Sequence, residues 1–122
     1  MGDLTRNISR SEGRCKCGCG FSPMDWETVE IVQGACDYFS LKLGKKVTLI
    51  ITSWCRCEYW NAYVDGAAFS QHLLGKACDH YIEGISTREL AEYYLTKYPG
   101  KFGIRVYDIF IHFDSRSGCW RG

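Results

Sequence analysis

The sequence predicts a single α+β domain spanning residues 1–122. Apolar side chains recur at intervals of three and four residues between positions 22 and 44 and again between 86 and 98, the spacing of helices packed on a core. The runs 47–53 and 102–114 are short and rich in strand-forming residues. With 122 residues, 46% of them hydrophobic and 24% charged, the chain has the composition of a globular domain with a sizeable core.

The first predicted helix begins at Ser22 and ends before Gly44. A serine is suited to cap the helix, and Pro23 then occupies the first helical position, where its missing N–H costs nothing. Gly44 is suited to end the helix in a left-handed conformation. The predicted core-facing positions are Trp26, Val29, Val32, Cys36, Phe39 and Leu43.

A second helix is predicted from Ser86 to Tyr98. Glu89 completes a capping box with Ser86, and Pro99 and Gly100 stop the helix. Irregular structure is predicted for the Gly- and Cys-rich residues 1–20 and for the loop through Asn61 and Gly66.

The last two predicted strands are joined by a turn at Tyr107 and Asp108. Side chains alternate between the two faces of a strand, so His112 and Asp114 are expected to point the same way. The same alternation separates Asp79 from His80. His80 is therefore predicted to be a surface or partly buried residue that points away from any site containing Asp79.

Charge and hydropathy exclude two classes of partner. Fifteen basic and fourteen acidic residues give a net charge of +1, which argues against the basic surface that nucleic-acid binding needs. The longest apolar run, at residues 47–51, is too short to span a membrane, and the polar first residues predict no signal peptide. We therefore expect a protein that is made in the cytoplasm. We also expect it to be a monomer.

The eight cysteines form two local groups and three isolated positions. Cys15, Cys17 and Cys19 alternate with other residues, and Cys55 and Cys57 form a second pair. The favoured interpretation is a disulfide between these two strips. A structural zinc site is an alternative that is not favoured, because C-x-C-x-C is not the usual C-x2-C zinc spacing. Inert buried thiols are the other alternative.

Two histidines and an aspartate suggest a zinc site. His72, Asp79 and His112 provide three ligands of the kind that leaves one position of a tetrahedral zinc for water, as catalytic zinc sites require. Zinc peptidases also need a base that handles the proton of this water. The spacing alone is not diagnostic, since the chain has no H-E-x-x-H helix and three such residues can be unrelated.

Longer motifs give these residues a context. Residues 70–79 follow the pattern S-x-H-x-x-G-x-A-x-D, and residues 110–114 follow F-x-H-x-D. Together they resemble the M15 zinc peptidases, the group of D-alanyl-D-alanine carboxypeptidases and phage endolysins. The resemblance to the small phage-type members covers roughly residues 8–118 and includes, in order, segments 10–20, 53–57, Asn61 and 98–108.

The resemblance implies a compact α+β fold of the kind shared with hedgehog domains, with an antiparallel sheet that carries one catalytic Zn²⁺. It implies His72, Asp79 and His112 as the zinc ligands. The implied activity is hydrolysis of amide bonds in peptidoglycan stem peptides, as a D-Ala-D-Ala carboxypeptidase or an endopeptidase. A phage-encoded lytic enzyme would be made in the cytoplasm of the infected bacterium and act on the cell wall.

The catalytic base is the point at which the chain departs from better-known relatives. Those proteins carry an acidic residue a few positions before the final histidine, whereas residues 109–111 are Ile, Phe and Ile here. Asp114, on the same strand face as His112, is the favoured base, and Asp108 in the turn is the second candidate. The alternative for Asp114 is to orient a ligand histidine or to pair with Arg116.

Two further residues are predicted to contact substrate. Arg56 resembles the family arginine that holds a substrate carboxylate or the developing oxyanion, with a solvated surface arginine as the alternative. Ser70 either bonds substrate or fixes the loop before His72. The altered acidic position also leaves a second function open, a catalytically inactive zinc-bearing binding module of the same fold.

Overall fold

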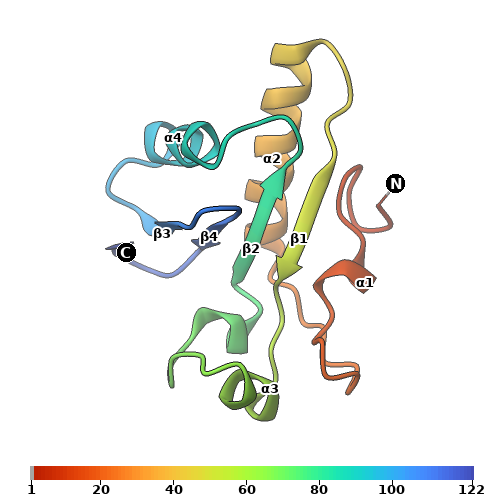
Figure 1. Ribbon diagram of the computed structural model, residues 1–122, viewed down its shortest axis with the longest axis vertical. Coiled ribbons are helices and arrows are strands. Elements are labelled where there is room, and N and C mark those ends of the chain that lie inside the picture. Colours follow the sequence, from red (N-terminus) through yellow and green to blue (C-terminus); the bar gives the residue numbers. More distant parts are fainter. Residues whose placement is uncertain (1) are drawn as a thin grey trace.

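The computed structural model describes residues 2–122 as an α+β fold built on one five-stranded sheet (Figure 1). The helices are α1 (Arg10–Gly13), α2 (Trp26–Leu43), α3 (Glu58–Tyr63), the 3-10 helix η1 (Gln71–Leu74) and α4 (Thr87–Lys97). The strands are β1 (Leu49–Ser53), β2 (Ala77–Ile82), β3 (Phe102–Val106), β4 (Ile111–Asp114) and β5 (Cys119–Arg121). The α+β class predicted from the sequence is confirmed.

The strands lie in the order β1-β2-β4-β3-β5. Neighbouring strands among the first four are antiparallel, as the resemblance implied, and the short β5 runs parallel to β3, so the sheet is mixed. The predicted turn between β3 and β4 is also present, with the N–H of Tyr107 donating to the carbonyl of Phe110 at 2.9 Å.

The two faces of the sheet have different surroundings. Cys78 lies opposite Phe113 across the β2–β4 pair, and both belong to the core that α2 and α4 complete. Asp79 lies opposite His112, and Ala77 opposite Asp114, on the other face. The predicted shared face of His112 and Asp114 is thus confirmed. Because the helices fill one face with apolar side chains, the polar site can form only on the other.

Helix α2 begins three residues later than the helix start that Ser22 and Pro23 predicted. Asp25 is the actual N-cap, and its carboxylate accepts from the N–H of Thr28 at 3.1 Å. The backbone N–H of Asp25 is held by the carbonyl of Gly75 at 3.0 Å, a contact that sequence does not reveal. The helix therefore starts where the chain meets the loop before β2.

The predicted core positions of α2 are right in the middle of the helix and wrong at its ends. Val29, Val32, Cys36 and Phe39 are buried. Trp26 and Leu43 are 55% and 44% exposed. The C-terminal prediction holds, since Gly44 is left-handed with φ 69° and donates its N–H to the carbonyl of Ser40.

The second helix was placed correctly, but three short helices were missed, namely α1, α3 and the 3-10 helix η1. The Ser86 hydroxyl caps α4 by accepting from the N–H of Glu89. Helix α1 lies within the predicted irregular segment, and α3 replaces the predicted loop through Asn61. Such short helices depend on tertiary contacts rather than on propensity, so local sequence gives little sign of them.

The N-terminal segment lies beside β1 and reaches the loop that follows this strand (Figure 1). The N–H of Cys55 donates to the carbonyl of Gly13 at 2.9 Å, and the sulfur of Cys57 lies 3.7 Å from that of Cys15. A disulfide needs about 2.0 Å. All eight cysteines, each within the described residues, are free, so the predicted disulfide is wrong although the two strips do meet.

Within residues 2–122, no helix has the length and apolar character that crossing a bilayer requires.

Candidate metal centre

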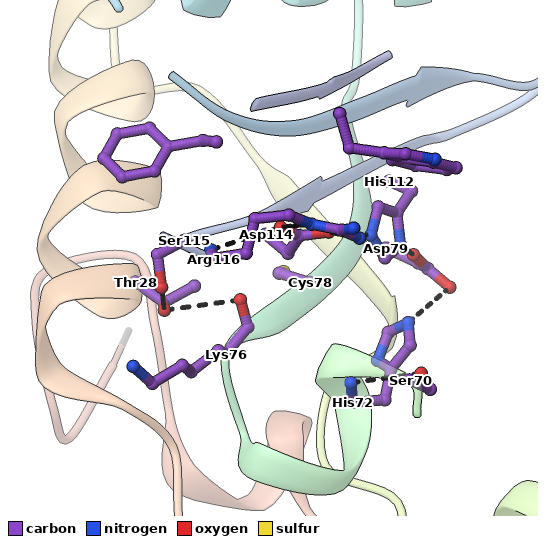
Figure 2. A network of polar contacts seen from close by, with 12 residues as sticks. Thr28, Ser70, His72, Lys76, Cys78, Asp79, His112, Asp114, Ser115 and Arg116 are labelled. Carbon is purple, nitrogen blue, oxygen red and sulfur yellow. Dashed lines mark hydrogen bonds and ion pairs between the residues drawn. The ribbon is translucent and has the colours of Figure 1, made fainter. Parts of the chain in front are cut away.

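Three predicted ligands come together on the polar face of the sheet (Figure 2). His72 belongs to η1, Asp79 to β2 and His112 to β4. The Nε2 atom of His72 lies 3.2 Å from Oδ2 of Asp79, and Nδ1 of His112 lies 2.9 Å from Oδ1 of the same carboxylate. One ligand atom from each residue can be chosen so that all three lie within 4.8 Å of one another.

Local structure explains how three residues separated by 7 to 40 positions meet. Asp79 and His112 are directly opposite each other in the β2–β4 register, so their side chains leave the sheet together. His72 is brought over them by the turn of η1. The Ser70 hydroxyl caps that turn by accepting from the N–H of His72 at 3.2 Å (Figure 2).

The outer nitrogen of each histidine already has a partner. Nδ1 of His72 lies 2.6 Å from the carbonyl oxygen of Trp54, which can only accept, so this nitrogen carries the proton. Nε2 of His112 lies 2.7 Å from Oδ2 of Asp114. Such outer partners fix the tautomer and ring orientation of metal-binding histidines. They direct Nε2 of His72 and Nδ1 of His112 toward Asp79.

The contacts between Asp79 and the inner nitrogens of His72 and His112 indicate which kind of ligand these three residues can bind. In neutral imidazoles with protonated outer nitrogens, the two inner nitrogens present lone pairs to the carboxylate of Asp79, and acceptors then face an acceptor. A cation bound among the three groups removes this conflict. Two imidazoles and a carboxylate are common ligands of Zn²⁺, so the residues present fit this metal.

Electrostatics around Asp79 also favour the charged carboxylate. Burial raises the pKa of Asp79, but hydrogen bonds and charge interactions with His112 and His72 outweigh this effect, so its pKa lies well below the usual range. Burial lowers the pKa of His112, while hydrogen bonds with Asp114 and Asp79 raise it, and the net change is upward. Without a cation, a protonated His112 ring donates to Asp79, and a bound cation takes the place of that proton. The site is therefore built to keep an anionic ligand between its two rings.

Asp114 is buried and engaged on both oxygens. Arg116 contacts Oδ1 through Nε and Oδ2 through Nη2, each at 2.7 Å, and Oδ2 also faces His112. Burial raises the pKa of Asp114, but the contacts with Arg116 and His112 lower it by a larger amount, so its pKa lies well below the usual range. These contacts hold the Asp114 carboxylate and the His112 ring in fixed positions relative to each other.

The next residue secures this strand to α2. The hydroxyls of Ser115 and Thr28 lie 2.6 Å apart (Figure 2). The N–H of Ser115 also donates to the carbonyl of Lys76 at 3.0 Å. Thr28 is the residue whose N–H is capped by Asp25. The contacts that set the start of α2 thus also hold the end of β4.

Arg56 lies at the edge of the three-residue cluster. Its Nη2 is 3.4 Å from Oδ2 of Asp79, its Nε donates to the hydroxyl of Ser53 at 3.1 Å, and its Nη1 reaches Oδ1 of Asn61 at 3.4 Å. Burial lowers the pKa of Arg56 in spite of Asp79. Arg56 is therefore held against the site rather than being a solvated surface arginine.

The remaining predicted residues differ in their surroundings. Ser70 caps η1 and, together with Arg56, Phe69 and Leu74, lines a pocket that shares Arg56 with the surroundings of Asp79. Asp108 is exposed in the turn between β3 and β4. The carboxylate of Asp114 contacts His112, whereas Asp108 makes no hydrogen bond or ion pair with the cluster in the described part of the chain.

His80 points to the opposite face, as predicted, but it is fully buried rather than partly exposed. Its Nδ1 lies 3.0 Å from the carbonyl of Cys78, and its Nε2 lies 2.9 Å from the hydroxyl of Tyr94 in α4. Burial lowers the pKa of His80 to about 4. A tertiary partner on α4 makes this burial possible, and the local sequence does not show that partner.

Several residues of the site were not predicted. Trp54 contributes a backbone carbonyl, which carries no side-chain signal. Ser53 and Asn61 hold Arg56, and the sequence marked both only as part of the family pattern. The β1–β2 register shifts between Ile51 and Ser53, a bulge-type irregularity that redirects the chain next to the site.

Comparison with known families gives this geometry a context. A family model described as Peptidase M15 matches residues 3–114, nearly the whole chain. The chain belongs to the peptidase M15 family. Membership identifies this M15 peptidase as a hydrolase of the zinc metallopeptidase type and agrees with the cluster of His72, Asp79 and His112. No match was found among curated proteins or among solved structures.

Proposed function

We propose that this M15 peptidase hydrolyses amide bonds in peptidoglycan stem peptides, with His72, Asp79 and His112 holding one catalytic zinc ion. The observation that carries the proposal is the orientation of the two imidazoles. Each has its outer nitrogen committed to a partner and its inner nitrogen directed at Asp79. This division leaves both inner nitrogens free to present their lone pairs to a single metal ion beside the Asp79 carboxylate.

Three protein ligands leave a tetrahedral metal one open position, which distinguishes catalytic from structural zinc. When bound, the zinc supplies Lewis acidity, polarising a carbonyl and lowering the pKa of water toward about 7. The protein's part is to keep the two rings fixed. Trp54 does this for His72 through its carbonyl, and Asp114 for His112 through its carboxylate.

Arg56 is proposed to bind the substrate carboxylate or the developing oxyanion. Its guanidinium is fixed by Ser53 and Asn61 beside Asp79, and it lines the same pocket as Ser70. A guanidinium remains charged and offers a planar fork to a carboxylate. Ser70, whose oxygen accepts from the N–H of His72, is proposed to position this pocket wall and to meet the substrate at its edge.

The base is assigned between the two candidate aspartates by their surroundings. A general base must reach the reacting proton and have a pKa near the working pH. Both oxygens of Asp114 are engaged and its pKa is strongly lowered, so we propose that Asp114 orients His112. Asp108 lies in the turn that leads into β4, and its exposed carboxylate has no hydrogen-bond or ion-pair partner among the described residues. This unengaged carboxylate is proposed as the proton-handling group, which requires the turn to approach the substrate.

The choice of peptidoglycan comes from the motifs shared with the carboxypeptidase and endolysin members of the family. We propose a phage-type lytic enzyme that acts as a monomer at the cell wall. A terminal D-alanine presents a free carboxylate to Arg56, whereas an internal bond presents none. Mass spectrometry of digested muropeptides distinguishes these outcomes, because a carboxypeptidase removes one alanine and an endopeptidase divides the stem.

The test uses purified peptidoglycan incubated with the protein, with and without a chelator, and measures new amino groups. Zinc-dependent release supports the proposal. Release that the chelator does not affect contradicts the metal assignment. Stoichiometric zinc without any release favours the second candidate, an inactive zinc-bearing binding module, which the absence of an acidic residue at positions 109–111 keeps open.

A further inference from the structure

A second group of metal-binding side chains lies outside the histidine site. The thiols of Cys15, Cys17 and Cys19 in the N-terminal segment meet that of Cys57, which follows β1. All four sulfurs lie within 4.8 Å of one another. Cys55 is buried in the core and is not part of this cluster, although it is only two residues from Cys57.

The spacing of the sulfurs fits tetrahedral coordination. The Sγ atoms of Cys15 and Cys17 are 3.5 Å apart, and each lies 3.7 Å from that of Cys57. With a Zn–S bond of about 2.3 Å, tetrahedral geometry separates the sulfurs by about 3.8 Å. A disulfide would bring one pair to about 2.0 Å and would leave the others unpaired.

The backbone around the cluster is arranged as it is around bound thiolates. The N–H of Cys57 points to the sulfur of Cys15, and that of Trp60 points to the sulfur of Cys57, each at 3.4 Å. Hydrogen bonds of this kind support metal ligands from outside the coordination sphere. Between Cys17 and Cys19, Gly18 adopts φ 87°, which permits a tight turn that a residue with a side chain rarely adopts.

We propose that Cys15, Cys17, Cys19 and Cys57 bind a second, structural zinc ion as four thiolates. Four protein ligands close the coordination sphere, so this ion has no open position for water or substrate. Binding displaces the four thiol protons into solvent. Soft thiolates in a tetrahedral set select zinc over the hard cations that oxygen ligands prefer.

The position of the cluster gives the ion a role. It joins the N-terminal segment to the loop after β1, and Cys57 directly follows Arg56. The N–H of Cys55 also donates to the carbonyl of Gly13, so the protein part of this connection includes a backbone hydrogen bond. The zinc therefore fastens the N-terminal segment to the loop that presents Arg56 to the histidine site.

The first test uses the wild-type protein purified without added chelator. Metal analysis is expected to give about two zinc ions per chain, one for each site. Titration with an organomercurial is expected to release one of them as the thiols react, with the released zinc followed by a coloured chelator. Intact mass and thiol counting of the unfolded protein are expected to give eight free thiols.

The second test compares cysteine variants inside and outside the cluster after cobalt substitution. Wild-type protein is expected to show the near-ultraviolet sulfur-to-cobalt absorption of a tetrathiolate site. The double variant Cys17→Ser/Cys19→Ser should lose this absorption and one zinc, whereas Cys119→Ser, which alters an exposed cysteine outside the cluster, should keep both. His112→Ala should keep the sulfur-to-cobalt absorption, which separates this site from the proposed catalytic one.

Three results would overturn the proposal. The first is an intact mass showing a disulfide among the four cysteines in freshly purified protein. The second is about one zinc per chain with no metal–sulfur absorption in the wild type, and the third is iron as the bound metal. Because these readouts come from wild-type protein, they decide the question even if the double variant fails to fold.

Discussion

His80 and His112 lie on neighbouring strands, yet the two faces of the sheet give them opposite properties. His80 faces α4, where the Tyr94 hydroxyl and the Cys78 carbonyl engage both ring nitrogens and burial lowers its pKa to about 4. His112 lies between the carboxylates of Asp79 and Asp114, and its pKa is raised. The groups that cover each face, rather than the residue type, decide which histidine is available to a metal.

The strongest test of this comparison removes the histidine of the polar face. His112→Ala is expected to abolish zinc binding at the histidine site and reduce hydrolysis to background, because two ligands cannot replace the three-ligand set. Metal analysis and the peptidoglycan assay measure the two effects. A variant that retained full catalytic zinc would remove the site assignment.

The next largest effect is expected at the exposed aspartate of the β3–β4 turn. Asp108→Asn should lower kcat by about 10²-fold or more while zinc content stays unchanged, since general-base catalysis contributes about this much. Glu83→Gln, which neutralises an exposed carboxylate in the turn after β2, serves as the control and should retain activity. If Asp108→Asn has wild-type kinetics and Asp114→Asn loses turnover with full zinc, the base is Asp114.

Asp114→Asn tests whether the buried carboxylate orients His112. The amide oxygen can still accept from His112, but the charge that faces Arg116 is lost, so we expect zinc affinity to fall about 10–100-fold. Competition with a zinc chelator measures this change. With saturating zinc, activity should recover much of its wild-type value, and failure to recover would show a direct role in turnover.

Arg56→Ala is expected to lower kcat/KM by about 10–100-fold, corresponding to the loss of one charge-assisted interaction with substrate. Zinc content should not change, because Arg56 contacts the cluster only at its edge. Arg88→Ala, at an exposed position of α4, is the matched control. Steady-state kinetics on a defined stem peptide measure kcat/KM for the two variants. Equal kcat/KM values would show that Arg56 does not contact the substrate.

The smallest effect on activity is expected on the helix-covered face. His80→Gln should leave zinc binding and kcat unchanged but reduce the free energy of unfolding by about 1–3 kcal/mol, because the buried Tyr94 hydroxyl loses a well-placed partner. Denaturant unfolding measures the cost. Loss of zinc in a folded His80→Gln protein would show that the two faces are not independent.

Local sequence was sufficient for features that depend on neighbours along the chain. The alternation of side chains placed His112 and Asp114 on one face, and Ser86 marked the start of α4, because strand geometry and helix capping act over a few residues. The family motifs led to the three residues of the metal centre, which the structure brings together.

Tertiary structure decided what depends on distant partners. The Gly75 carbonyl placed the start of α2 at Trp26, and Arg116 and His112 together engaged the carboxylate of Asp114. Cys55 and Cys57 are only two residues apart, yet Cys57 lies in the thiol cluster and Cys55 in the hydrophobic core. Sequence specifies which groups are present, but burial and hydrogen bonding depend on what the folded chain places against them.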